Sequence, residues 1–79
     1  MPTVLRVGPY RFFFFSNEGS EPPHIHVESA DNYAKFWLMP IGLARSVGYN
    51  SGELRRLRLL VESNTAFFLE KWHEDFRSE

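Results

Sequence analysis

Short apolar runs separated by turn residues fill the first 47 residues, and this pattern is typical of β-strands. Residues 41–47 fit either a short strand or an irregular crossover, and we favour the strand. The turns are predicted at Gly8-Pro9, in the polar loop 17–23, at Asp31-Asn32 and at Met39-Pro40. The other predicted strands are Thr3–Val7, Tyr10–Ser16, His24–Ser29 and Tyr33–Leu38.

The hydrophobic spacing changes after Asn50, where apolar residues begin to recur at helical intervals. Asn50 is a favourable N-cap, and Glu53 lies three residues later, as in a capping box. The pattern predicts one helix from about Ser51 to Phe76, roughly 40 Å long at 1.5 Å per residue. We therefore expect a single α+β domain over residues 1–79, with the sheet in 1–48 and the helix in 50–77. The antiparallel sheet would have four to five strands, with one long C-terminal helix packed on one face.

The length of 79 residues predicts one small domain, and the absence of cysteine excludes disulfides and zinc–thiolate sites. A net charge of −1 gives no general attraction to nucleic acid or to membranes. The start of the chain lacks the basic and apolar regions of a signal peptide. The longest apolar run, Phe12–Phe15, is too short to cross a bilayer. We expect a cytoplasmic protein that does not enter the membrane.

The predicted strand Tyr10–Ser16 has two apolar faces. Phe12 and Phe14 point to one side, and Phe13 and Phe15 point to the other. One helix can cover only one of these faces. We therefore predict a homodimer in which a second subunit covers the other face.

Two histidines and a carboxylate share one face of the next predicted strand. Alternation places His24, His26 and Glu28 on one side, with Ile25 and Val27 on the core side. Histidines two positions apart on a strand lie about 6.6 Å from each other. They could chelate a divalent metal with Glu28 as the third ligand. The plainer alternative is a set of exposed polar residues on a half-solvated sheet. Our preferred interpretation assigns no metal and no cofactor.

A hairpin between this strand and the next would place Tyr33, Lys35 and Trp37 beside His24 and His26. Histidines exchange protons near neutral pH, and a lysine can stabilise charge that develops on a phosphate. Tyrosine and tryptophan can stack on unpaired bases. These groups occur together in small metal-independent ribonucleases. They are also the components of an ordinary amphipathic sheet surface.

Arg55 and Arg56 lie near the predicted start of the helix, where cations oppose the helix dipole. Local helix energetics therefore do not explain them. They could bind phosphate or an acidic partner surface, or their stems could cover core residues. Arg11 is a further candidate contact on the sheet.

Several segments, taken together in their order and spacing, resemble a family of small prokaryotic proteins called domain of unknown function 4160. This sequence departs from the family pattern at Ser51-Gly52, where a proline and a polar residue are expected. The resemblance implies a component of a small two-gene module of suspected toxin–antitoxin type, with a second small protein as partner. It implies no catalytic residues. The matching segments are Pro2–Leu5, Tyr10–Glu18, Pro23–Val27, Ala34–Leu38 and Glu53–Leu57.

We therefore predict a small toxin–antitoxin-type protein that acts on RNA, with His24, His26 and Lys35 as catalytic residues. Two alternatives stay open. The first is a non-enzymatic, dimerising interaction module that binds a partner protein. The second is a metal-binding module built on His24 and His26.

Overall fold

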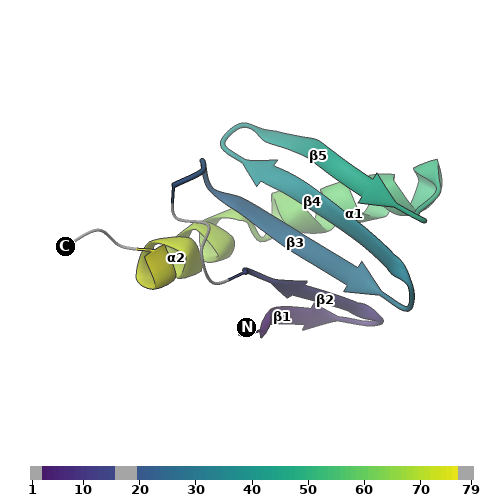
Figure 1. The fold of residues 1–79 in the computed structure, drawn as a ribbon, viewed down its shortest axis with the longest axis horizontal. Helices are drawn as coiled ribbons and strands as arrows, with labels where there is room; N and C mark the ends of the chain where they lie inside the picture. The colour runs from purple at the N-terminus through teal and green to yellow at the C-terminus, as the bar shows by residue number, and fades with distance from the viewer. Residues whose placement is uncertain (1–2, 16–19, 77–79) are drawn as a thin grey trace.

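The computed structural model describes residues 3–15 and 20–76, and its strands form an antiparallel five-stranded sheet. Each strand pairs with the next one along the chain, so the order is β1-β2-β3-β4-β5 (Figure 1). The antiparallel sheet and the strand at 41–47 are thereby confirmed. The strands are β1 (Thr3–Val7), β2 (Tyr10–Phe13), β3 (His24–Ser29), β4 (Asn32–Leu38) and β5 (Ile41–Val47).

Strand β2 ends at Phe13, earlier than predicted, and the expected end at Ser16 lies outside the described residues. Phe14 and Phe15 leave the sheet ladder because their rings pack at the end of the sheet. The Phe14 ring lies 5.4 Å from the ring of Trp72, and the Phe15 ring lies 4.5 Å from that of His26. Phe14 is buried in the core, whereas Phe15 is 37% exposed.

The chain leaves β5 through Gly48, which has a φ of +93°. A Cβ atom at this position would collide with the side chain of Asn32. Only glycine satisfies both the left-handed backbone and the close approach. The preceding hairpin, β4–β5, turns at Met39-Pro40, whose peptide bond is cis.

Two helices follow the sheet, α1 (Ser51–Ser63) and α2 (Thr65–Phe76), so the prediction of one long helix is wrong. The predicted start is correct. The Glu53 backbone N–H donates to Asn50 Oδ1 at 2.8 Å, and the Asn50 N–H donates to Glu53 Oε1 at 3.3 Å. Together they form the capping box expected from the sequence.

The break between the helices occurs at Asn64. Its backbone N–H donates to the carbonyls of both Leu60 and Val61, and its side-chain Nδ2 donates to Leu60 O at 2.8 Å. Thr65 Oγ1 donates to Val61 O at 2.7 Å. Side-chain donors of this kind compete with the helical backbone and end or bend a helix. The sequence Ser63-Asn64-Thr65 is therefore the signal that a search for proline and glycine alone overlooks.

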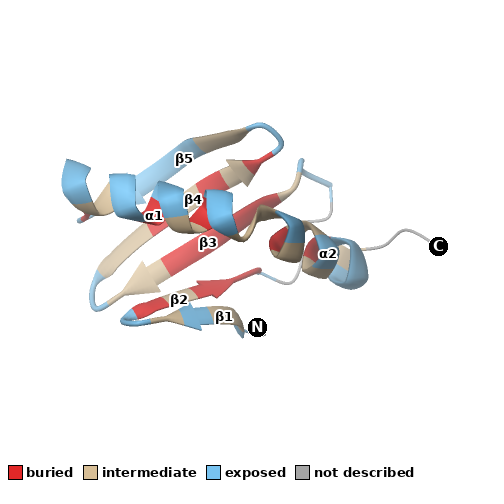
Figure 2. Cartoon of the chain, turned by 180° about the vertical axis from the view of Figure 1, so that it is seen from behind, coloured by how far each residue is buried: buried red, intermediate tan, exposed pale blue. Residues whose placement is uncertain are grey.

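The core lies between the helices and one face of the sheet (Figure 2). The rings of Phe12 and Phe68 are 5.3 Å apart across this interface. No helix in the described part of the chain has the length and apolarity needed to cross a membrane. The fully buried core residues include Phe12, Ile25, Val27 and Phe36 from the sheet, and Leu57, Val61 and Phe68 from the helices.

Candidate functional site

The register of the sheet brings together all the predicted site residues except Arg55 and Arg56. In the β3–β4 pair, His24 lies opposite Trp37, His26 opposite Lys35, and Glu28 opposite Tyr33. Arg11 on β2 lies opposite Glu28. This arrangement matches the hairpin expected from the sequence. These residues occupy the sheet face that the helical core does not use.

The two histidines are buried on this face. His24 is 0% exposed and His26 is 2% exposed, so the expectation of exposed polar residues is wrong for them. Their rings lie 5.0 Å apart at right angles. The His24 ring also contacts Trp37 and Trp72, and the His26 ring contacts Phe13 and Phe15. We call this group the histidine cluster: His24, His26, Phe13, Phe15, Tyr33, Trp37 and Trp72.

Ring nitrogens of both histidines make hydrogen bonds within the fold. His24 Nδ1 lies 2.9 Å from the Pro22 carbonyl, which can only accept, so Nδ1 carries the proton in this bond. The other nitrogen, Nε2, is buried. His26 Nδ1 lies 2.6 Å from Tyr33 Oη. Proton exchange with an external substrate would therefore require the cluster to open.

Lys35 and Arg11, the cations at the rim of the cluster, make ion pairs within the chain. Lys35 Nζ lies 3.0 Å from Glu21 Oε1 and 4.6 Å from the centre of the Trp37 ring. Arg11 Nη1 lies 2.8 Å from Glu28 Oε2, and its guanidinium covers the Phe13 ring at 4.5 Å. The sequence pattern gives no signal for Glu21, whose carboxylate also lies 3.8 Å from His24 Nδ1.

The metal-binding alternative has no third ligand among the residues that the structure describes. No group of three potential ligands there is arranged to hold a metal ion. Glu28, the ligand suggested by the sequence, instead pairs with Arg11. The geometry therefore gives the alternative no support from the described side chains.

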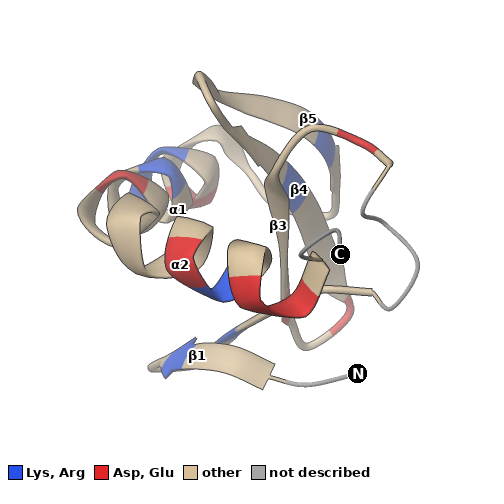
Figure 3. Cartoon of the chain, turned by 90° about the vertical axis from the view of Figure 1, so that its left-hand side faces the viewer, with Lys and Arg blue, Asp and Glu red and all other residues tan. Residues whose placement is uncertain are grey.

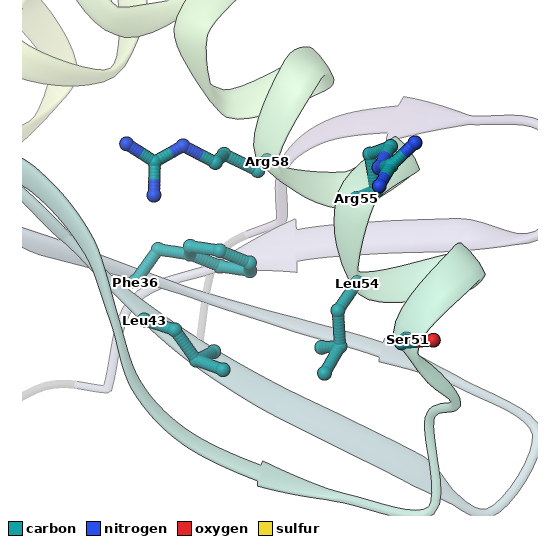
Figure 4. A pocket seen from close by; sticks show the side chains of 6 residues that line it. All are labelled: Phe36, Leu43, Ser51, Leu54, Arg55 and Arg58. Carbon is teal, nitrogen blue, oxygen red and sulfur yellow. The ribbon is translucent and has the colours of Figure 1, made fainter.

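Arg55 and Arg56 lie on α1, on the other side of the sheet from the histidine cluster. Arg55 lines a groove of about 280 Å³ between β5 and the first turns of α1, and Arg56 does not line it. Figure 4 shows the apolar side chains of this groove below Arg55 and Arg58. We call it the β5–α1 groove, and its lining residues are Phe36, Leu43, Ser51, Leu54, Arg55 and Arg58.

A bulge in β5 gives the groove one of its walls. Lys35 pairs with Arg45, but the next residue, Phe36, pairs with Leu43, so Ala44 is an extra residue in the ladder. Leu43 therefore turns toward the helices with Phe36, while Arg45 turns toward the histidine face with Lys35. Without the bulge, positions 43 and 45 would share one face. Neither residue stands out in the sequence, because the hydrophobic pattern does not reveal the position of the bulge.

The two helices carry opposite charge. Figure 3 shows basic residues on α1 and mainly acidic residues on α2. The arginines of α1 are Arg55, Arg56 and Arg58. Only the last of these makes an ion pair among the described residues, to Glu62 at 3.1 Å. The groove therefore lies at the basic end of the helical layer.

These features define a small α+β domain with a closed aromatic–histidine cluster on one sheet face and an open groove at one sheet edge. A family model described as "Domain of unknown function (DUF4160)" matches residues 10–73. The chain belongs to this family. No curated protein and no solved structure matches it.

Proposed function

We propose that the protein is a non-enzymatic interaction module that binds a small partner protein, as one component of a toxin–antitoxin-type pair. The observation that carries this proposal is the burial of His24 and His26. Residues that act on a substrate must reach it. These two side chains instead pack as core residues and use their Nδ1 atoms within the fold.

The exposed surface supports the same proposal. Large apolar side chains are exposed on β5, where Leu43 is 44% and Val47 is 49% exposed. Exposed apolar residues near arginines are common in protein interfaces. The two-component assignment follows from the family resemblance.

The second candidate is an RNA-binding or RNA-cleaving protein, and the sheet register favours it. Lys35 lies between His26 on β3 and Arg45 on β5. Trp37 and Tyr33 are partly exposed on the same face. Two adjacent cations and two aromatic rings could contact phosphates and bases. Catalysis by His24 and His26 stays a prediction that requires the cluster to open.

One experiment separates the two candidates. The chain is expressed alone and together with the product of the neighbouring gene, and complex formation is measured by calorimetry on the purified proteins. The purified chain is also incubated with a fluorogenic RNA oligonucleotide across the neutral pH range. We expect a stoichiometric complex and no RNA cleavage above a buffer control.

Lys35→Gln provides the matched variant, because the Lys35 side chain is 19% exposed and is not part of the hydrophobic core. We expect this variant to leave complex formation unchanged. Cleavage with a bell-shaped pH profile, reduced about 10²-fold or more in Lys35→Gln, would establish the enzyme instead. No complex with the neighbouring gene product would contradict the interaction module.

The homodimer stays a prediction. A homodimer was predicted because the strand that contains Phe13 has a second aromatic face. The chain itself covers this face at Phe13. Phe13 is 2% exposed beneath Phe15, His26 and Arg11. Light scattering decides the question, since a mass near 9.3 kDa indicates a monomer.

A further inference from the structure

The β5–α1 groove combines an apolar floor with a cationic rim. Phe36, Leu43 and Leu54 form the floor, and Arg55 and Arg58 stand beside it (Figure 4). None of the six lining residues is acidic. The groove therefore favours a ligand that carries both apolar groups and negative charge.

The two arginines are available to such a ligand at little cost. In the part of the chain that the structure describes, no carboxylate lies within salt-bridge distance of Arg55. Among the described residues, Arg58 pairs with Glu62, and both side chains of this pair are more than 40% exposed. Exposed pairs of this kind contribute little to stability. A carboxylate beside Arg55 would also offset the unfavourable position of this cation near a helix N-terminus.

The groove lies at the small end of the size range of binding sites. Its volume is about 280 Å³, and sites for small molecules usually measure about 300–1,000 Å³. One or two side chains of a larger partner fit a groove of this size.

Strand β5 supplies the second element of a binding surface, because it lies at the edge of the sheet and has β4 as its one neighbour among the described strands. An edge strand exposes backbone N–H and C=O groups that can pair with another strand. In an added strand, alternate side chains would point toward the groove. An extended segment could therefore use the backbone of β5 and the groove at the same time.

We propose that the β5–α1 groove binds an extended segment of the partner protein, which adds to the sheet beside β5 and presents both apolar and acidic side chains on the face turned toward the groove. The apolar side chains contact Leu43 and Leu54, and the carboxylates pair with Arg55 and Arg58. This inference rests on the proposed function and specifies the chemistry of the partner.

A second copy of the chain fits this surface less well. The only charged residue of β5 is Arg45, so two β5 edges placed together would bring like charges close. The acidic residues of α2 could complement Arg55 of a second copy, but a helix cannot add to a sheet edge. They are Glu70, Glu74 and Asp75.

The first test is an NMR titration of the full-length, ¹⁵N-labelled chain. The probe is a synthetic peptide with the repeat Val-Thr-Glu-Thr, so that valine and glutamate share one face of the added strand and threonine occupies the other. One control peptide has lysine in place of glutamate, and the other has serine in place of valine. We expect saturable shifts confined to β5 and the first turns of α1, with the acidic apolar peptide only, and weaker binding at high salt. Shifts elsewhere, no shifts, or equal binding of the lysine peptide would overturn the inference.

Matched variants then test whether the residues that line the groove bind the peptide. Leu43→Asp and Arg55→Glu should each weaken peptide binding by about tenfold or more. Leu59→Asp changes a leucine that is 57% exposed on α1 and does not line the groove. Arg56→Glu changes the neighbouring arginine, which also lies outside the groove. Both controls should retain binding within about twofold.

The same four variants are then titrated with the neighbouring gene product. Loss of binding in Leu43→Asp and Arg55→Glu alone supports the inference. A complex that survives both changes would overturn it and leave the proposed function standing. Light scattering then compares the masses of the wild type and Leu43→Asp. A wild-type dimer that becomes a monomer in this variant would identify a second copy as the occupant of the groove and overturn the inference.

Discussion

Strands β3 and β5 show opposite relations between side-chain chemistry and burial (Figure 2). The four consecutive residues His24–Val27 are all buried, although two of them are histidines. In β5, the apolar Leu43 and Val47 are exposed. Strand β3 lies at the centre of the sheet with both faces covered, and β5 lies at an edge. In this protein, position in the sheet decides burial more strongly than hydrophobicity does.

The comparison also separates structural residues from binding residues. The histidines have the chemistry of catalysts, but their surroundings are those of core residues. Burying a polar group is unfavourable unless it is hydrogen-bonded. The bonds from His24 to Pro22 and from His26 to Tyr33 satisfy one ring nitrogen of each histidine. The exposed residues of β5 and α1 are therefore the better place to seek a ligand.

The largest expected effect on stability is at Trp72, the residue of α2 that belongs to the histidine cluster. Its ring contacts those of Phe14, His24 and Phe76. Trp72→Ala should lower the free energy of unfolding by about 3–5 kcal/mol, the usual range for a buried aromatic residue. Urea unfolding followed by circular dichroism measures this change. A loss below about 1 kcal/mol would place Trp72 outside the core, and Leu59→Ala is the exposed control.

The next largest effect on stability should distinguish a residue of β3 from a residue of β5. His26→Ala removes a buried ring and its hydrogen bond to Tyr33, and should cost about 2–4 kcal/mol. Leu43→Ala removes a half-exposed side chain at the sheet edge and should cost less than about 1 kcal/mol. Unfolding of both variants under the same conditions provides the test. If Leu43→Ala were the more damaging change, the contrast between centre and edge would be wrong.

A smaller effect concerns the hydrogen bond inside the cluster. Tyr33→Phe removes the hydroxyl that lies 2.6 Å from His26 Nδ1 and should cost about 1 kcal/mol. The double variant with His26→Ala should show a coupling energy of at least about 0.5 kcal/mol. Additive losses in this cycle would mean that the bond contributes nothing to stability.

The smallest effect is a pH dependence at Tyr49, where the end of β3 meets the segment after β5. Burial raises the pKa of Tyr49 above 10.0, and the hydrogen bond with Ser29 partly opposes this increase. Above pH 10, the unfolded state releases this proton before the folded state does, so stability should fall as pH rises. Tyr49→Phe should show a shallower fall in unfolding free energy above pH 10. An unchanged slope would contradict the raised pKa.

Local signals predicted the fold well. The capping box at Asn50 and Glu53 and the strands near His24 and Ile41 depend on residues close in sequence. The helix break at Asn64 was also local, but it arises from side-chain hydrogen bonds and not from proline or glycine.

The candidate site was predicted only in part. The sequence predicted that His24 and His26 would face Trp37 and Lys35, because alternation and hairpin pairing are regular. It did not predict their burial, which depends on Phe15 and on Trp72, far away in the chain. It also missed the groove, because one extra residue in β5 determines which way Leu43 points.

The strand order β1-β2-β3-β4-β5 has a consequence for how the chain folds during synthesis. Each strand pairs with its neighbour in sequence, so little loop-closure entropy opposes each pairing. The sheet can form as soon as residues 3–47 have left the ribosome. Its core face then stays uncovered until Leu57 and Phe68 have been synthesised, and the histidine cluster stays incomplete until Trp72 has been synthesised. During that interval a nascent chain presents a folded sheet with an uncovered apolar face, where a chaperone could bind before the helices dock.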